Sequence, residues 1–389
     1  MDMAEAPGAP VITSEPGTFA WTVLAERHPA LIQQVSDAFP YPPEQRRALD
    51  ALLEETAHGV VEPLPDGAPD RAQWAEWGRD HIGRSWFEVP FLWAESYFYR
   101  RLLEAVGYFG PGPWRGIDPF APFKRAELDG APVAEELAAL DEVARLPLEA
   151  QDRALLTGAL WGNRADLGFL ISSGGSAEAG AEVVADDSAP FWRHVAQSPS
   201  ATVHLVADNA GRELIPDLVL LDHLLSTGRA DRAVLHVKPS PYYVSDATTA
   251  DVVDALRRMA RAPGRAGETG SRLWAALAAG RLSVHAHLFS CAPLTYADMP
   301  GDLRADLARA TVAVVKGDLN YRRLVGDRLW PATTPFADLT SYFPAPLLAL
   351  RTLKCDVAVG LAPPTVEALE SSAEAWRTTG TRAVIHFRP

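Results

Sequence analysis

The sequence predicts an α/β protein with a mostly parallel sheet in an α/β/α sandwich and an N-terminal helical subdomain. The second half alternates strand-like and helix-like segments, which is typical of a parallel sheet covered by helices through right-handed crossovers. The first half instead spaces its apolar residues by three and four, as amphipathic helices do. With 389 residues, 48% of them hydrophobic, the chain is long enough for a large core and two subdomains.

The N-terminal part is expected to be helical after a short tail. Residues 1–18 are rich in Pro, Ala and Gly, so we expect a flexible tail or an arm draped over the protein. Residues 19–165 form the predicted helical subdomain, with helical spacing at 31–35, 48–53 and 93–106. In the last of these stretches Glu95 precedes Arg100 and Arg101, and we expect an ion pair within the helix.

Residues 166–389 form the predicted α/β domain. Its glycine- and serine-rich residues 172–180 are interpreted as a linker, because they lack the Gly-Lys-Ser/Thr ending of a phosphate-binding loop. Apolar runs predict strands at 202–207, 233–237, 282–288, 311–315, within 347–359, and at 383–387. Helical spacing predicts helices at 213–225, 250–261, 270–279 and 365–376. The strand order does not follow from these patterns.

Charge and composition argue against several classes of function. The net charge of −14 argues against a nucleic-acid partner, since phosphate backbones need a basic face. Cys291 and Cys355 are the only cysteines, so neither a disulfide framework nor a CxxC metal knuckle is expected. The first residues do not resemble a signal peptide, and no apolar run approaches the roughly 20 residues that span a bilayer. We therefore expect a cytoplasmic protein without membrane contact, and no protein partner is indicated.

Oxygen-bearing side chains follow two of the predicted strands. Asp208 and Asn209 come directly after the strand at 202–207, and Asp246 follows the strand at 233–237 in the run Tyr-Val-Ser-Asp. Side chains at the carboxyl end of a strand in an open α/β sheet point into the crevice where ligands bind. Carboxylate and amide oxygens suit hard divalent cations, so these three residues are the predicted metal ligands. Taken alone, Asp-Asn is also a common turn or helix N-cap pair.

Basic and polar side chains follow the other predicted strands. Asn320 and Tyr321 can bond hydroxyls or phosphate, Arg322 offers a planar fork for phosphate oxygens, and Asp318 can bond sugar hydroxyls or orient a water. The alternative here is a helix N-terminus with a capping Asp and a solvated Arg. Lys354 lies among apolar residues, where its ammonium needs a partner such as phosphate or must reach solvent. Lys238, fixed by the proline after it, is a second candidate for phosphate.

The same segments resemble a known family. The motifs are Asp208-Asn-Ala-Gly, His236-Val-Lys-Pro with Val244-Ser-Asp, Lys316-Gly-Asp-Leu-Asn-Tyr-Arg, Leu350-Arg-Thr-Leu-Lys, Trp93-Ala-Glu-Ser-Tyr-Phe-Tyr-Arg-Arg and Leu160-Trp-Gly-Asn-Arg-Ala-Asp. Together they resemble the DUF89 family of metal-dependent damage-control phosphatases, and within it the acidic-residue methyltransferase 1 subfamily with its Arg-Thr-x-Lys signature. The resemblance runs roughly from residue 19 to residue 361.

The resemblance implies a site, a set of metals and a substrate class. It implies metal binding by Asp208, Asn209 and Asp246, and substrate binding by the stretch Asp318, Leu319, Asn320, Tyr321 and Arg322 together with Lys354. It also implies Mn²⁺, Co²⁺, Ni²⁺ or Mg²⁺ as the metal and sugar phosphates such as fructose 1-phosphate as substrates. A metal-polarised water or a covalent aspartyl-phosphate at Asp208 would each suit such a site, and the sequence does not separate these routes.

Two other functions compete with a phosphatase of small phosphorylated metabolites. An S-adenosylmethionine-dependent carboxyl methyltransferase is suggested by the subfamily's name, but no glycine-rich turn follows a first strand. A non-catalytic sensor of phosphorylated metabolites would fit a chain that had lost a motif residue, and every matched position is filled. The ten histidines show no zinc-site spacing, so His204 and His236, within apolar strands, are interpreted as core residues.

Overall fold

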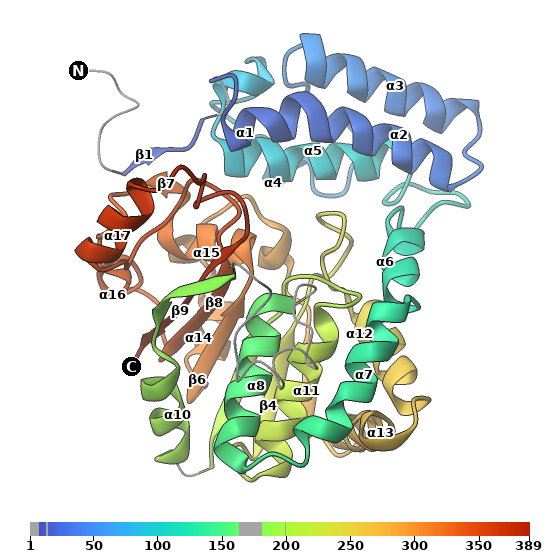
Figure 1. Ribbon diagram of the computed structural model, residues 1–389. Helices are drawn as coiled ribbons and strands as arrows, with labels where there is room; N and C mark the ends of the chain where they lie inside the picture. The colour runs from blue at the N-terminus through green and yellow to red at the C-terminus, as the bar shows by residue number, and fades with distance from the viewer. Residues whose placement is uncertain (1–7, 13–14, 163–180, 199) are drawn as a thin grey trace.

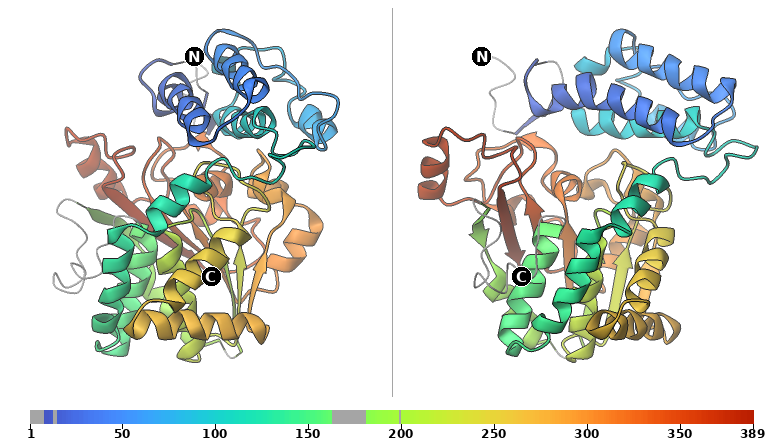
Figure 2. Two further views of the ribbon diagram at one scale, coloured as in Figure 1. Left: turned by 90° about the vertical axis from the view of Figure 1, so that its right-hand side faces the viewer. Right: turned by 45° about the vertical axis from the view of Figure 1, so that its right-hand side comes forward.

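Helices at the N-terminus form a layer over the edge of an α/β body (Figures 1 and 2). The computed structural model describes residues 8–12, 15–162, 181–198 and 200–389. The layer contains α1 (Phe19–Thr22), the π-helical turn Val23–Arg27, α2 (His28–Ala38), α3 (Pro43–His58), α4 (Arg71–Trp77) and α5 (Phe91–Ala105). The prediction of helices in this part of the chain is therefore confirmed.

Three further helices lead down from this layer along the α/β body (Figure 1). They are α6 (Ala121–Leu128), α7 (Ala131–Val143) and α8 (Leu148–Trp161). Helix α7 contacts α13, and α8 contacts α11 and β8. Their buried side chains, including Leu137 and Leu156, share one apolar cluster with the sheet residues Leu205 and Leu235. The motif residues 163–166 and the expected linker at 172–180 lie outside the described residues.

A seven-stranded sheet forms the centre of the body. Its strands are β2 (Glu182–Asp186), β3 (Thr202–Val206), β4 (Arg232–His236), β5 (Leu282–His285), β6 (Val312–Lys316), β8 (Leu347–Thr352) and β9 (Arg382–Arg388). The order is β2-β9-β8-β6-β3-β4-β5, and every neighbouring pair is parallel except β8 with β9. The expected mostly parallel α/β sheet is thus confirmed, and β3, β4, β5, β6 and β8 all end at the same edge.

Helices of the second half connect these strands. They are α10 (Ser188–Ala196), α11 (Leu214–Ser226), α12 (Thr249–Ala260), α13 (Gly264–Ala278), α14 (Gly301–Leu307), α15 (Asp318–Val325), α16 (Phe336–Leu339) and α17 (Pro363–Glu370). Helix α13 starts earlier than its apolar spacing suggested. Its Gly270 lies against the backbone of α12, where a Cβ atom would come within 2.5 Å of the Ala260 nitrogen, so the two helices cross closely.

Two expected strands end sooner than the sequence suggested. After β5 the chain leaves the sheet, and the His287 side chain accepts a hydrogen bond from the Phe289 amide to start the 3-10 turn Leu288–Cys291. After β8 the chain turns where Arg351 donates a 2.5 Å hydrogen bond to the Val357 carbonyl. Strand β2 was not predicted, and it pairs with β9 at one edge of the sheet.

The two faces of the sheet belong to two apolar clusters, because alternate residues of each strand point to opposite faces. In β3, Val203 and Leu205 face the cluster with α11, whereas Val206 faces the cluster shared with the N-terminal helices. The N-terminal segment also reaches the body, since Ala9–Pro10 (β1) pairs with Arg328–Leu329 (β7). No helix within the described ranges is long and apolar enough to cross a membrane.

Candidate active site

The loops after β3 and β4 bring the expected metal ligands together. Asn209 and Asp246 form an isolated antiparallel bridge. The Ala247 amide donates to the Asp208 carbonyl over 3.0 Å, and the Ala210 amide donates to the Ser245 carbonyl over 2.6 Å. Short backbone bonds of this kind fix both loops, so segments that are far apart in the sequence lie side by side at the carboxyl edge of the sheet.

A cavity of about 450 Å³ opens at this edge, beneath the N-terminal helices. Its volume lies within the range of small-molecule sites. Seven of the ten residues expected from the sequence line it: Asp208, Asn209, Asp246, Asp318, Leu319, Arg322 and Lys354. The N-terminal helices contribute Phe19, Arg27, Glu95 and Tyr99, and the loop before Asp246 contributes Tyr243, Val244 and Ser245.

Acidic groups crowd one wall of the cavity. Burial, and after it the charges of Glu213 and Asp246, raise the pKa of Asp208 well above its usual value, although Lys354 and Lys238 oppose the shift. The Asn209 amide donates to Glu213 over 2.9 Å, and its Oδ1 accepts a 2.7 Å hydrogen bond from Ser245. The amide oxygen therefore has its orientation fixed. The raised pKa means that the ionised form of Asp208 is disfavoured by burial and by the neighbouring acids, and a divalent cation would stabilise that form.

The Asp208 carboxylate fits against the backbone of residue 317 only because that residue is glycine. Gly317 has φ +89°, and a Cβ atom there would lie 1.9 Å from Asp208 Oδ2 and 2.0 Å from its Cγ. The carboxylate thus occupies the space that a side chain after β6 would fill. This cradle and the oxygen-rich donor set fit a hard divalent cation held by Asp208, Asn209 and Asp246.

Two lysines lie near the acidic wall. The Lys238 ammonium is buried, 4.0 Å from Asp246 Oδ2, and donates to the Ser290 carbonyl over 3.1 Å. Lys354 follows β8 by two residues and lines the cavity. Its positive charge partly offsets the rise in the pKa of Asp208 and helps to lower the pKa of Asp318. Within the described part of the chain, however, Lys354 forms no ion pair. Lys354 therefore remains available to a ligand.

Asp318 begins α15 and is held by Arg351 of β8. The Arg351 guanidinium contacts Asp318 Oδ1 from Nε at 2.9 Å and from a terminal nitrogen at 2.8 Å. Burial alone would raise the pKa of Asp318, but Arg351, Arg322 and Lys354 together lower it below the usual value. Asp318 therefore stays ionised and can accept hydrogen bonds from hydroxyl groups in the cavity.

Arg322 is engaged by protein carboxylates. Its guanidinium contacts Asp327 Oδ1 at 2.7 Å and Glu95 Oε2 at 2.9 Å, and its side chain is almost fully buried. The predicted ion pair of Glu95 within its own helix is wrong, because Glu95 faces Arg322 while Arg100 pairs with Asp70. This network joins α5 to α15 across the cavity.

Asn320 and Tyr321 lie away from the cavity. Asn320 donates to the carbonyls of Ala207 and Lys316 over 3.1 and 2.9 Å, which fixes the end of β3 beside α15. The Tyr321 hydroxyl contacts His386 Nδ1 at 3.2 Å, and its ring lies under the Arg351 guanidinium. Both are almost fully buried, so they support the site from beneath.

Sequence reasoning missed several residues of this site. Glu213, Glu95 and Tyr243 shape its charge and walls, and Gly317 leaves room for Asp208. The only signal for Gly317 was its place between β6 and an acidic residue. Glu95 carried no local signal, because its partner Arg322 lies 227 residues later.

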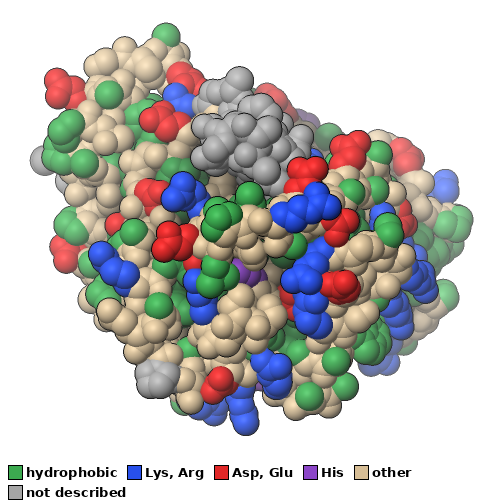
Figure 3. Space-filling model, turned by 60° about the horizontal axis from the view of Figure 1, so that its bottom comes forward, with side chains coloured by type: hydrophobic (Ala, Val, Ile, Leu, Met, Phe, Trp, Pro, Cys, Tyr) green, Lys and Arg blue, Asp and Glu red, His purple; other side chains and the backbone are tan. Residues whose placement is uncertain are grey.

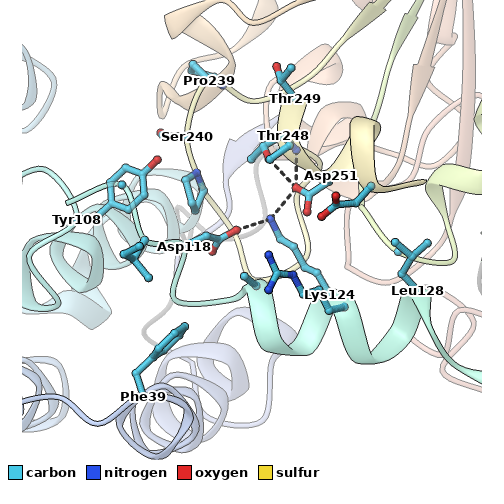
Figure 4. Close-up of a pocket in the computed structure, with 18 residues that line it drawn as sticks. Phe39, Tyr108, Asp118, Lys124, Leu128, Pro239, Ser240, Thr248, Thr249 and Asp251 are labelled. Carbon is cyan, nitrogen blue, oxygen red and sulfur yellow. Dashed lines mark hydrogen bonds and ion pairs between the residues drawn. The ribbon is translucent and has the colours of Figure 1, made fainter. Parts of the chain in front are cut away.

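A second cavity of about 530 Å³ lies between α6 and the start of α12 (Figure 4). There the Lys124 ammonium lies between Asp118 and Asp251, at 2.9 and 3.0 Å, as the dashed lines in Figure 4 mark. Two carboxylates compensate this lysine. The cavity beside Asp208 is therefore the better match to a metal and a phosphate.

Comparisons with known proteins agree along almost the whole chain. Residues 23–369 match the family described as the damage-control phosphatase ARMT1-like domain. Damage-control phosphatase ARMT1 of Mus musculus is 32% identical, with 99% of each chain covered, and that of Danio rerio is 31% identical, with 95% of each covered. The crystal structure of a DUF89 family protein from Pyrococcus horikoshii has a TM-score of 0.51 at 14% identity, covering 95% of this chain and 98% of that one. This last likeness concerns the fold.

Proposed function

Because the chain belongs to the damage-control phosphatase ARMT1-like family, we propose that it is a metal-dependent phosphatase of small phosphorylated metabolites. Sugar phosphates such as fructose 1-phosphate are the proposed substrates. The observation that carries the proposal is one cavity in which Asp208, Asn209 and Asp246 lie together with Lys354. A metal and a phosphate fit this combination of oxygen donors and a cation.

Asp208, Asn209 and Asp246 would hold the divalent cation, with Mn²⁺, Co²⁺, Ni²⁺ and Mg²⁺ as candidates. When bound, such a cation supplies Lewis-acid polarisation of phosphate and water oxygens. The Asn209 amide nitrogen donates to Glu213 and Asp208 while its oxygen accepts from Ser245, so the amide would turn its oxygen toward the ion when the ion binds. The carboxylate of Asp246 is oriented by the Tyr243 amide, which donates to it over 3.0 Å.

The remaining residues bind and orient the substrate. Lys354 neutralises charge on the phosphoryl group, and the buried Lys238 adds a positive field behind Asp246. Ionised Asp318 accepts hydrogen bonds from hydroxyls of the organic part. Arg322 acts as a positioning residue, since its two ion pairs hold α5 and α15 around the cavity. Phe19 and Tyr99 of the N-terminal helices add apolar surface to the lining of the cavity.

The surface and the cysteines suit a cytoplasmic enzyme of small molecules. On the face that Figure 3 shows, acidic and basic side chains are interspersed and do not gather into a basic patch. The protein's net charge of −14 likewise disfavours nucleic acid. Cys291 and Cys355 are both free, as expected of a reducing compartment.

Phosphate release after chelation and metal readdition tests the proposal. Wild type, Asp246→Asn and the control Asp50→Asn, an exposed position of α3, would be assayed with p-nitrophenyl phosphate and fructose 1-phosphate. Metal-restored release, lost in Asp246→Asn and kept in Asp50→Asn, is expected. If the folded wild type released no phosphate with any of the four metals, the proposal would be overturned. Metal-independent binding of S-adenosylmethionine would favour a methyltransferase.

A further inference from the structure

Histidines of three neighbouring strands face the same side of the sheet, away from α11. His204 lies on β3, His236 on β4 and His285 on β5, and His236 is directly opposite His285 in the parallel register. His204 Nδ1 and His236 Nε2 are 2.9 Å apart, and both side chains are almost fully buried. The apolar runs around them hid this grouping, because each histidine is isolated in its own strand.

A carboxylate from α14 completes the group. Ligand atoms of His204, His236 and Asp306 all lie within 4.8 Å of one another. Asp306 Oδ2 is also 2.9 Å from His285 Nδ1. Since β5 is the edge strand and His285 is partly exposed, an ion can approach from that edge of the sheet.

The chemical state of the histidines suits metal binding. Burial lowers the pKa of His204 to about 4, and burial followed by the charge of His204 lowers the pKa of His236 to about 3. Both rings are therefore neutral at physiological pH, which is the form that ligates metals. Two imidazoles and a carboxylate are a donor set for Zn²⁺ and related transition metals, whereas Mg²⁺ prefers oxygen alone.

We propose that His204, His236 and Asp306 form a second metal site, for a transition-metal ion of the Zn²⁺ class, apart from the cavity of the phosphatase. His204 precedes Asp208 by four residues, and His236 lies opposite Val206, two residues before Asp208, so the two sites are separated along the strands by roughly 7 to 13 Å. His285 acts as an outer residue that orients the Asp306 carboxylate. The ion would join β3 and β4 to α14.

Metal entry requires a small rearrangement. Two nitrogens bound to tetrahedral Zn²⁺ at about 2.05 Å lie about 3.3 Å apart, so the 2.9 Å pair must open by a few tenths of an ångström. Both nitrogens must present lone pairs, so the ring that now donates changes tautomer. A water supplies the fourth ligand of an ion held by three protein groups.

The test measures metal binding in protein whose oxygen site is weakened by removing the Asp246 charge. Asp246→Asn protein would be stripped with chelator and titrated with Zn²⁺ by calorimetry and with Co²⁺ by visible absorption. One Zn²⁺ per chain and the intense visible bands of tetrahedral Co²⁺ are expected. Adding His236→Gln or Asp306→Asn should weaken binding at least ~100-fold, and adding His285→Gln should weaken it about 10- to 100-fold.

The matched control is His58→Gln, which changes an exposed histidine at the end of α3 in the same way. It should leave the Zn²⁺ affinity and the Co²⁺ bands unchanged. Asp306 is less buried than the two strand histidines, so Asp306→Asn keeps the test valid if the histidine variants do not fold. Stripped, folded Asp246→Asn protein that takes up no Zn²⁺ would overturn the proposal, as would Zn²⁺ affinity unchanged by Asp306→Asn. Neither result depends on phosphatase turnover.

Discussion

Replacing Gly317 by alanine tests the geometry of the proposed metal site most directly. Gly317 precedes α15 with φ +89° and ψ 171°, a conformation that residues with a Cβ atom rarely adopt. The added Cβ would lie 1.9 to 2.5 Å from three atoms of the Asp208 carboxyl group. Because the Asp208 backbone is held by the Ala247 amide at 3.0 Å, the side chain has to move instead.

The size of the effect follows from these two costs. The backbone strain alone should lower the free energy of unfolding by about 1–3 kcal/mol. Displacement of the Asp208 carboxylate would remove one of the three proposed protein ligands, so the affinity for Mn²⁺ should fall by more than the roughly 10- to 100-fold typical of an outer-shell change. Turnover at a fixed Mn²⁺ concentration should fall in parallel.

Urea unfolding and calorimetric Mn²⁺ titration would be compared with a matched variant, Gly280→Ala. Gly280 has φ +69°, and no atom lies within 4 Å of the position that an added methyl group would occupy, so this variant carries backbone strain without a clash. It should lose about 1–2 kcal/mol of stability and keep its Mn²⁺ affinity. If Gly317→Ala bound Mn²⁺ as tightly as Gly280→Ala, the assignment of Asp208 as a ligand in this geometry would be refuted.

Two further variants probe buried ionisable groups. Burial lowers the pKa of His28 from 6.5 to about 3, and neither ring nitrogen has a hydrogen-bond partner among the described residues. Below about pH 6.5 the imidazole is protonated in the unfolded chain but stays neutral in the folded chain. The free energy of unfolding of the wild type therefore decreases as the pH is lowered. The His28→Phe variant lacks this proton, so its free energy of unfolding relative to wild type should increase by about 1.4 kcal/mol for each unit by which the pH is lowered from about 6.5 to 4.5, as measured by urea unfolding. A difference that stays constant over this pH range would contradict the prediction. Lys124→Met leaves Asp118 and Asp251 without their shared cation, so the free energy of unfolding in urea should fall by about 3 kcal/mol. The Mn²⁺ affinity should not change. A fall of less than about 1 kcal/mol would show that solvent already screens the two carboxylates.

Local patterns were sufficient where the chemistry depends on strand ends. Apolar runs located β3, β4, β6 and β8, and the residues after them do lie at one edge of a mostly parallel sheet. Strand β2 was not predicted because it is an edge strand, at the other end of the sheet from β5. None of its residues is fully buried, so its apolar pattern is weak. The end of β8 depends on the Arg351 bond to Val357, which a one-dimensional pattern does not record.

Pairings between distant residues could not be read from the sequence. The fork of Arg322 suggested phosphate, but Glu95 and Asp327 already occupy it, and Glu95 belongs to a helix of the other half of the chain. The contact between His204 and His236 likewise exists only because β3 and β4 pair in a particular register. Donor types can be predicted from position at strand ends, whereas the partner that neutralises a charge depends on the assembled fold.

The balance of charge in the cavity indicates why the proposed cation would matter for substrate binding as well as for chemistry. Four carboxylates and three cationic side chains line it: Glu95, Asp208, Asp246 and Asp318 against Arg27, Arg322 and Lys354. Arg322 is already paired with Glu95 and Asp327, and Asp318 is paired with Arg351, which leaves Asp208 and Asp246 facing Arg27 and Lys354. A dianionic phosphate would find no surplus of positive charge there, in a protein whose net charge is −14. A divalent cation at the proposed ligands Asp208, Asn209 and Asp246 would give the cavity a net positive charge, so under the proposal substrate affinity and catalysis would both depend on the same ion.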